Sequence, residues 1–347
     1  MQGKPQRIVV IDWSMIGDLI MLSPCIGALH TAYPAAHLAI LGTPASIATY
    51  RAHPAVSELI PYDRSHGDWH VPSFMDTVRR LRAGRFDLAY IFHNSIGSAL
   101  MAKLGGVKQR IGYRYEGRDI LLTGKVRIPE ERMHLMEMKA NLLRASGIEV
   151  AEPLREELYI DEQSAGAWLK EKLGPNFGRT RPIVAVSIGS TVEHKRWSAQ
   201  SLNEFLTLFP VNSADFIFLG SPAERAQYDG VYSYNNTVVD LVGQTTIEEL
   251  VWVLDRVDLF VGPDSGPVHM SVARNRPVVA LFGPSDPRRA GPLNYDRAEV
   301  IASESICAAC QARLGKQMQH CLHAIPAGEI YAAASRLLKQ HSPRWHG

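Results

Sequence analysis

The stretch DLFVGPDSGPVHMSVARNRPVVALFGPSD, residues 258–286, alternates between two kinds of pattern. It opens with an apolar run, passes through a turn of Gly, Pro, Asp and Ser, continues as a helix-like segment, and returns to an apolar run at Pro277. Short apolar runs bounded by turn residues predict buried strands, and the segment between them is typical of a helix. This order favours a parallel sheet covered by helices.

The same alternation extends over much of the chain. Apolar runs rich in β-branched residues recur at 7–12, 37–43, 86–92, 182–190 and 215–221, with helix-like segments between them. Strands that alternate with helices predict a doubly wound, mostly parallel sheet.

A change of composition near the middle of the chain indicates a domain junction. Residues 150–181 carry many charges and a Gly- and Pro-rich exit, and 347 residues exceed the usual size of a single core. We therefore expect an α/β protein with two doubly wound, Rossmann-like domains that face a central cleft. The first domain would comprise residues 1–165 and the second residues 166–347.

The composition is that of an ordinary globular protein. The chain is 46% hydrophobic and 21% charged, and its formal net charge of +2 gives no reason to expect nucleic acid as a partner. Basic residues gather at 108–127, where they form either a phosphate-binding patch or a solvated face. The N-terminus lacks the pattern of a signal peptide, and the four cysteines suit a reducing compartment. We expect a cytoplasmic protein, with association to a membrane surface left open.

The turn after the strand at 258–264 is the first candidate site. The carboxyl end of a parallel strand that faces a helix N-terminus is where α/β sheets bind ligands, and the positive helix end favours a phosphate. Asp264, Ser265, Gly266 and His269 would surround such an anion. In the alternative interpretation, Asp264 or Ser265 only caps the helix and His269 is a packed core side chain.

Two further segments carry candidate residues. In SIGSTVEHKRW, residues 187–197, Ser190 and Thr191 offer hydroxyls and Lys195 a positive charge, although a solvated lysine beside a packing Trp197 is the alternative. SMIGDLIMLSP, residues 14–24, lacks both the dinucleotide fingerprint and the Walker pattern. There Asp18 either caps a helix or accepts a proton from an attacking hydroxyl.

The segment CAACQARLGKQMQHCLH, residues 307–323, contains ligand types found in structural zinc sites. The candidate ligands are Cys307, Cys310, Cys321 and His323. Because the spacing is irregular, we expect reduced cysteines without a metal and keep these four residues as the ligands of any metal site.

Taken together, the motifs resemble the ADP-heptose:lipopolysaccharide heptosyltransferases of glycosyltransferase family 9. The resemblance rests on the ordered segments 14–24, 110–114 (RIGYR), 133–148 (MHLMEMKANLLRASGI), 189–197, 262–287 and the cysteine segment. It implies a GT-B architecture in which the N-terminal domain binds the acceptor and the C-terminal domain the nucleotide sugar. It also implies an inverting, metal-independent transfer of heptose from ADP-heptose to inner-core lipopolysaccharide, without a cofactor, at the inner face of the cytoplasmic membrane.

The resemblance also assigns roles to residues. Asp18 would be the general base, and Lys195 would stabilise the leaving ADP. The donor would be bound by Ser190, Thr191, Lys195, Glu224, Asp264, Ser265, Gly266 and His269, and the lipid-linked saccharide acceptor by Arg110, Arg114 and Arg118. The alternatives are a transferase of the same fold that uses another nucleotide sugar or a protein or natural-product acceptor, a non-catalytic binding scaffold, and a nucleotide-sugar epimerase.

Overall fold

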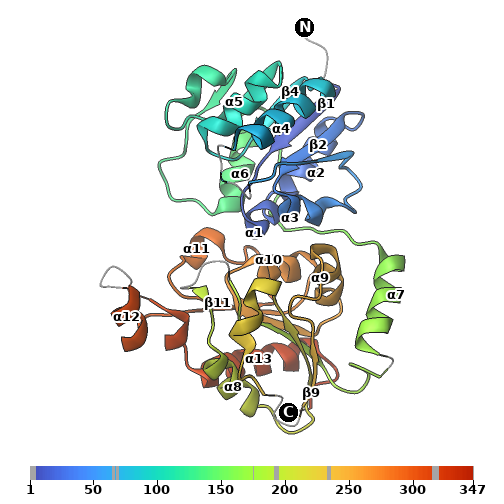
Figure 1. Cartoon of the computed structure of the whole chain (residues 1–347), viewed down its shortest axis with the longest axis vertical. Coiled ribbons are helices and arrows are strands. Elements are labelled where there is room, and N and C mark those ends of the chain that lie inside the picture. Colours follow the sequence, from blue (N-terminus) through green and yellow to red (C-terminus); the bar gives the residue numbers. More distant parts are fainter. Residues whose placement is uncertain are drawn as a thin grey trace. The chain divides into compact units, whose positions relative to one another are not determined.

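The computed structural model describes residues 5–64, 67, 70–174, 176–190, 195–232, 236–314 and 320–346. The chain divides into two compact units, Met1–Tyr159 and Ile160–Gly347. The predicted boundary after residue 165 lies inside the first helix of the second unit, α7 (Glu162–Leu173). Figure 1 shows the two units.

The N-terminal unit is built on a six-stranded parallel sheet with the order β3-β2-β1-β4-β5-β6. Its strands are β1 (Arg7–Ile11), β2 (His37–Gly42), β3 (Glu58–Pro61), β4 (Leu88–Ile91), β5 (Gln109–Tyr113) and β6 (Gly124–Val126). Its helices are α1 (Ile16–Ile20), α2 (Ser23–Ala32), α3 (Pro44–Ile47), α4 (Val71–Gly84), α5 (Ile96–Leu104) and α6 (Leu135–Arg144), with 3-10 turns η1 (Ala48–Tyr50) and η2 (Arg118–Leu121). The order of the strands reverses between β1 and β4, which makes the unit doubly wound.

Both faces of this sheet are covered. Val9 and Ile11 of β1 belong to a core cluster with residues of α4 and α5, and the alternate residues Ile8 and Val10 are also fully buried. Because successive side chains of a strand point to opposite faces, β1 is apolar throughout rather than alternating. The run RIVVI is therefore a central strand.

The C-terminal unit repeats this topology with the strand order β12-β11-β10-β7-β8-β9, again all parallel. Its strands are β7 (Ile183–Ser187), β8 (Asp215–Leu219), β9 (Thr237–Asp240), β10 (Leu259–Pro263), β11 (Val278–Phe282) and β12 (Ala298–Ala302). Besides α7, its helices are α8 (Ala199–Thr207), α9 (Ile247–Leu254), α10 (Gly266–Ala273), α11 (Pro287–Ala290), α12 (Ala308–Leu314) and α13 (Ala327–His341), with 3-10 turns η4 (Pro222–Tyr228) and η5 (Leu322–Ala324). The predicted α/β class and doubly wound topology are confirmed in both units.

The core of the C-terminal unit fixes the loop that follows β7. Trp197 is fully buried, donates its backbone N–H to the Ile188 carbonyl at 3.0 Å, and packs edge-on against Phe205 of α8 at 5.6 Å between ring centroids. Phe205 in turn contacts Phe209 in the same aromatic cluster. This anchor holds the residues just before Trp197 close to the end of β7.

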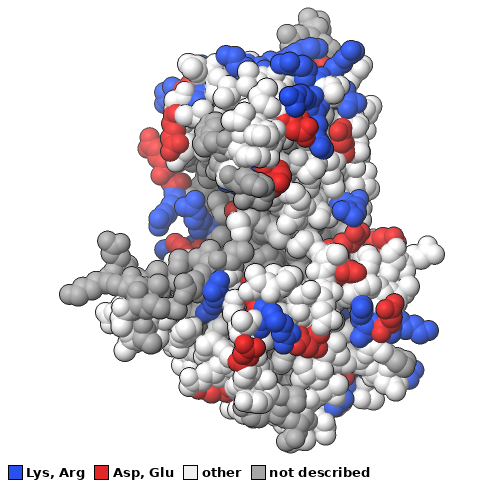
Figure 2. All heavy atoms as spheres, viewed as in Figure 1, with Lys and Arg blue, Asp and Glu red and all other residues white. Residues whose placement is uncertain are grey.

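Surface charge is mixed over the molecule. On the face shown in Figure 2, Lys and Arg side chains are interspersed with Asp and Glu. Among the described residues, no helix has the length and apolar character needed to cross a membrane.

Candidate active site

The site of the C-terminal unit lies where the strand order reverses, between β7 and β10. These strands are neighbours, with Val186 in register with Val261, and both end at the same edge of the sheet. The carboxyl ends of parallel strands at such a switch point form the usual ligand site of doubly wound folds. The predicted motifs at 187–197 and 262–269 both follow these two strands and therefore lie at this edge.

An ion pair joins the two motifs. Lys195 Nζ lies 2.6 Å from Asp264 Oδ2, and the two side chains are 26% and 10% exposed. Asp264 is held by its backbone N–H, which donates to the Leu281 carbonyl of β11 at 2.9 Å, and the Trp197 anchor holds Lys195. Although 69 residues separate them in sequence, the two motifs thus form one site.

Ser190 lies in the segment that follows β7. It is 6% exposed, and its carbonyl accepts a hydrogen bond of 2.9 Å from Arg196 Nε. Arg196 therefore closes the loop, a role that the sequence did not single out. Thr191 lies outside the described residues.

Helix α10 presents its N-terminus at the same edge. Gly266 is its first residue and Ser265 its N-cap, and Ser265 Oγ donates to the Pro263 carbonyl at 2.9 Å. His269, in the first turn, is only 2% exposed, so its ring lies in the interior of the unit. The positive end of the helix and the Lys195 ammonium make this edge suited to a diphosphate.

Glu224 approaches the same edge from the neighbouring strand, β8. It lies in η4, and its carboxylate accepts the Ser221 N–H at 2.6 Å in a capping box. Its carboxylate packs so closely over Gly189 that a Cβ at that position would overlap it. Gly189 thus leaves room for the Glu224 carboxylate in this position, and a side chain there would move the carboxylate.

Asp18 belongs to the N-terminal unit, in the first turn of α1 after β1, and is partly buried. The loop that leads to it is organised by Asp12, which is 1% exposed. Asp12 Oδ1 accepts the Ser14 N–H at 3.1 Å, and Oδ2 pairs with the Lys139 ammonium. Burial acts to raise the pKa of Asp12, but the Lys139 charge and hydrogen bonds from Lys139 and Ser14 outweigh it and lower the pKa below its usual value.

The sequence did not single out the Asp12–Lys139 pair. Each residue on its own gave a signal of a buried charge, because Asp12 directly follows the apolar run of β1 and Lys139 stands among the apolar residues of LMEMKANLLR. Charged side chains are rarely buried unless they are paired.

The three arginines predicted for the acceptor differ in exposure. The Arg118 side chain is fully buried and donates to the Tyr113 and His93 carbonyls at 2.8 and 2.7 Å, and burial lowers its pKa to about 10. Arg110 donates to the Leu121 carbonyl at 2.7 Å and to the Val107 carbonyl. Arg114 is 49% exposed and pairs with Asp119 at 2.6 Å. Arg110 and Arg118 thus stabilise the fold here, and Arg114 alone of the three presents a largely exposed guanidinium.

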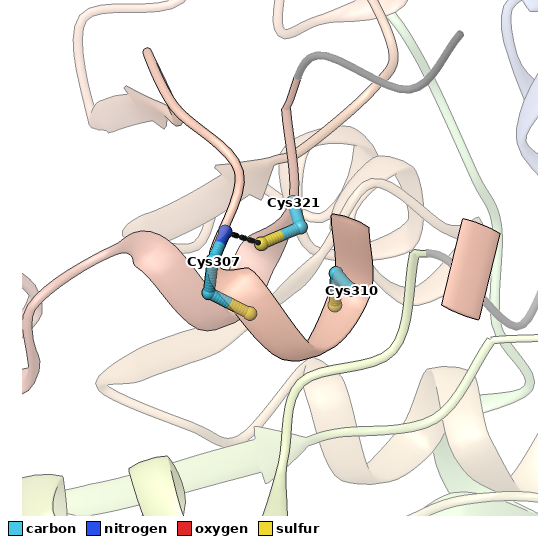
Figure 3. A group of neighbouring side chains, drawn as sticks. All are labelled: Cys307, Cys310 and Cys321. Atoms are coloured by element: carbon cyan, nitrogen blue, oxygen red, sulfur yellow. Dashed lines mark hydrogen bonds between the residues drawn. The ribbon is translucent and has the colours of Figure 1, made fainter. Parts of the chain in front are cut away.

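The cysteine segment brings its candidate ligands together. All four cysteines of the chain are free, and the Sγ atoms of Cys307, Cys310 and Cys321 lie within 4.8 Å of one another (Figure 3). His323 Nδ1 lies 3.5 Å from Cys310 Sγ. Burial and the neighbouring Cys307 and Cys321 raise the pKa of the Cys310 thiol to about 12.

Two Rossmann-like units, one with an anion site at its switch point, are typical of GT-B glycosyltransferases. The family model "Glycosyltransferase family 9 (heptosyltransferase)" matches residues 75–320, and the chain belongs to this family. The predicted family and GT-B fold are confirmed.

Individual relatives support this assignment. Lipopolysaccharide heptosyltransferase 2 of Escherichia coli (strain K12) is 28% identical over 305 residues, which cover 85% of this chain and 87% of the relative. The crystal structure of the glycosyl transferase family 9 from Veillonella parvula DSM 2008 matches with a TM-score of 0.84 at 22% identity and covers 96% of this chain and 98% of its own. E. coli ADP-heptose lps heptosyltransferase II matches with a TM-score of 0.79 at 24% identity, covering 96% of this chain and 99% of its own.

Proposed function

We propose that this chain transfers a heptose from ADP-heptose to a hydroxyl of inner-core lipopolysaccharide or a related lipid-linked saccharide. The C-terminal unit would bind the nucleotide sugar and the N-terminal unit the acceptor. The reaction would take place at the inner face of the cytoplasmic membrane, because the acceptor is anchored in that membrane. The Lys195–Asp264 ion pair beside the N-terminus of α10 is the observation that carries the proposal.

The donor half of the mechanism follows from this edge of the sheet. As the bond between the anomeric carbon and the diphosphate breaks, negative charge develops on ADP. The Lys195 ammonium and the positive end of α10 would stabilise this charge, so the reaction would need no divalent metal. Asp264 would hold Lys195 in place and contact the sugar. Ser190, Thr191, Ser265 and Gly266 would complete the diphosphate and sugar contacts, and His269 would support the first turn of α10 from within the unit. Glu224 would accept hydrogen bonds from the ribose.

The acceptor half rests on Asp18. Its carboxylate would accept the proton of the acceptor hydroxyl while that oxygen attacks the anomeric carbon from the face opposite the leaving ADP. One displacement of this kind inverts the anomeric configuration. Arg114 is the arginine best exposed to contact a phosphate of the acceptor.

Isothermal titration with ADP-heptose, UDP-glucose and GDP-mannose, without added metal, tests the donor. We expect selective binding of ADP-heptose, followed by turnover on a lipopolysaccharide acceptor and a product of inverted configuration by NMR. Preference for another nucleotide sugar would leave the family assignment valid and overturn the proposed donor. Turnover with a protein or natural-product acceptor alone would overturn the proposed acceptor.

A further inference from the structure

The cysteine cluster lies outside the donor site and has the geometry of a metal site. Cys307 and Cys310 come from the start of α12, and Cys321 and His323 come from the segment that follows α12 in the chain. Cys310 and Cys321 are 4% and 1% exposed, so two of the three sulfurs are shielded from solvent. Figure 3 shows the three cysteine side chains converging from these two segments.

The distances agree with those of a tetrahedral zinc ion. Zn–S and Zn–N bonds of about 2.3 and 2.1 Å at tetrahedral angles separate two sulfurs by about 3.8 Å and a sulfur from a nitrogen by about 3.6 Å. The three Sγ atoms lie within 4.8 Å of one another, and Cys310 Sγ is 3.5 Å from His323 Nδ1. Side-chain rotations would therefore place the three sulfurs around one ion, and His323, next to Cys310, is positioned to supply the fourth ligand.

The backbone also favours a thiolate at this position. The Cys307 N–H points to Cys321 Sγ at 3.3 Å. A hydrogen bond of this kind stabilises a negatively charged sulfur and orients it, as contacts outside the ligand shell do in metal sites. We propose that Cys307, Cys310, Cys321 and His323 bind one Zn²⁺ ion.

Four protein ligands close the coordination shell, so the ion is structural and takes no part in the transfer reaction. It fixes residues 303–310 and 320–325 next to the end of β11. Ser303 N–H donates to the Phe282 carbonyl at 2.7 Å, and Cys321 N–H donates to the Ser305 carbonyl at 3.0 Å. Gly283 packs against this segment, since a Cβ there would lie 3.1 Å from Leu322 N. The zinc ion thus supports the turn that follows β11, independently of which donor the enzyme uses.

The test is the metal content of the full chain, purified without added metal or chelator and measured by inductively coupled plasma mass spectrometry. We expect about one zinc ion per chain in the wild type and below about 0.2 in Cys307→Ser and Cys310→Ser. Cys25→Ser is the matched control, because Cys25 is a buried cysteine of the N-terminal unit, and it should keep the full zinc content. Stoichiometric iron that is lost in the same variants would overturn the choice of zinc.

Cobalt binding gives a second measurement on the folded wild type, which remains informative if a cysteine variant misfolds. After removal of the metal, one equivalent of Co²⁺ should produce saturable thiolate-to-cobalt charge-transfer absorption, and the exposed His323→Ala should weaken Co²⁺ binding at least tenfold. A strong chelator should lower the unfolding midpoint of the wild type by about 5 °C or more and leave Cys307→Ser unchanged. Wild-type protein that contains no stoichiometric metal and gives no cobalt absorption, or that has a disulfide within the cluster under reducing conditions, would refute the site.

Discussion

Replacement of Lys139 by Met should strongly destabilise the N-terminal unit. Asp12 is 1% exposed, and the change leaves its carboxylate buried without its cation. Removing one partner of a buried ion pair costs about 3 to 5 kcal/mol. Proton linkage leads to a similar value. An Asp12 that stays protonated in the folded state at pH 7, but has a pKa of about 3.9 in the unfolded state, lowers the free energy of unfolding by about 4 kcal/mol.

The same change should reverse the pH dependence that Asp12 contributes. In the wild type its pKa is lowered, so the pair stabilises the fold above pH of about 4 and this contribution is lost as the pH falls through the folded pKa. Without Lys139, burial raises the pKa of Asp12 in the folded state. The loss of stability then grows as the pH rises above the pKa that Asp12 has in the unfolded chain. The cost of Lys139→Met should therefore be about 2.7 kcal/mol smaller at pH 5 than at pH 7.

Urea unfolding at pH 5 and pH 7, followed by circular dichroism, measures both effects. Lys108→Met is the matched control, because Lys108 is 77% exposed in its pair with Asp87 and should cost at most about 1 kcal/mol. The double change Asp12→Asn with Lys139→Met should recover more than half of the loss. A cost below about 1 kcal/mol for Lys139→Met, or a cost that does not depend on pH, would show that Asp12 is not a buried, paired carboxylate.

Three further predictions concern the proposed reaction. Asp18→Asn should lower kcat by about 100-fold or more and leave the Kd for ADP-heptose within about twofold, since a general base acts on the acceptor; unchanged turnover would remove Asp18 from that role. Lys195→Ala should weaken ADP-heptose binding by about 10- to 100-fold in calorimetry, because a charged contact to the diphosphate is lost. The control Lys170→Ala, at an exposed lysine, should leave binding unchanged. Equal affinities of Lys195→Ala and the wild type for ADP-heptose would contradict the diphosphate contact. Gly189→Ala should displace the Glu224 carboxylate and weaken donor binding, but it should lower the free energy of unfolding by at most about 1 kcal/mol, because the carboxylate is the far end of a flexible side chain. Gly166→Ala in α7, where a Cβ has open space, should be neutral or stabilising, and equal donor affinity in both variants would argue against Glu224 as a donor contact.

The central strands and the edge strand β9 could be predicted from sequence, but β5, β6 and β12 were missed. β7, β10 and β11 are buried at every position and form plain apolar runs. In contrast, β6 (GKV) is the edge strand and β5 (QRIGY) lies next to it. Both carry charged residues and are partly exposed, so their stretch gave the pattern of a basic patch. The edge strand β12 (AEVIA) is likewise mostly not buried. A strand with one neighbour and a solvated side needs no continuous apolar run.

The residues of the site also fall into two groups, those indicated by the sequence around them and those whose contacts join distant parts of the chain. Lys195, Asp264 and Gly266 stand in turns next to apolar runs, so local sequence was enough to single them out. The Asp12–Lys139 pair spans 127 residues, and the contact of Glu224 with Gly189 depends on how β7 and β8 lie side by side. Such contacts are fixed by tertiary packing, which no local pattern encodes.

The two units use the same topological position for opposite charges. In the N-terminal unit the strand order reverses between β1 and β4, and the residues after β1 are acidic, with Asp12 buried and Asp18 partly buried. In the C-terminal unit it reverses between β7 and β10, where Lys195 and the N-terminus of α10 provide positive charge. A carboxylate suits the removal of a proton from a hydroxyl, and positive charge suits a departing diphosphate. One fold, present twice in the chain, thus provides both kinds of group that a glycosyl transfer from a nucleotide sugar needs, and the differences lie in the loops after the first strand of each unit.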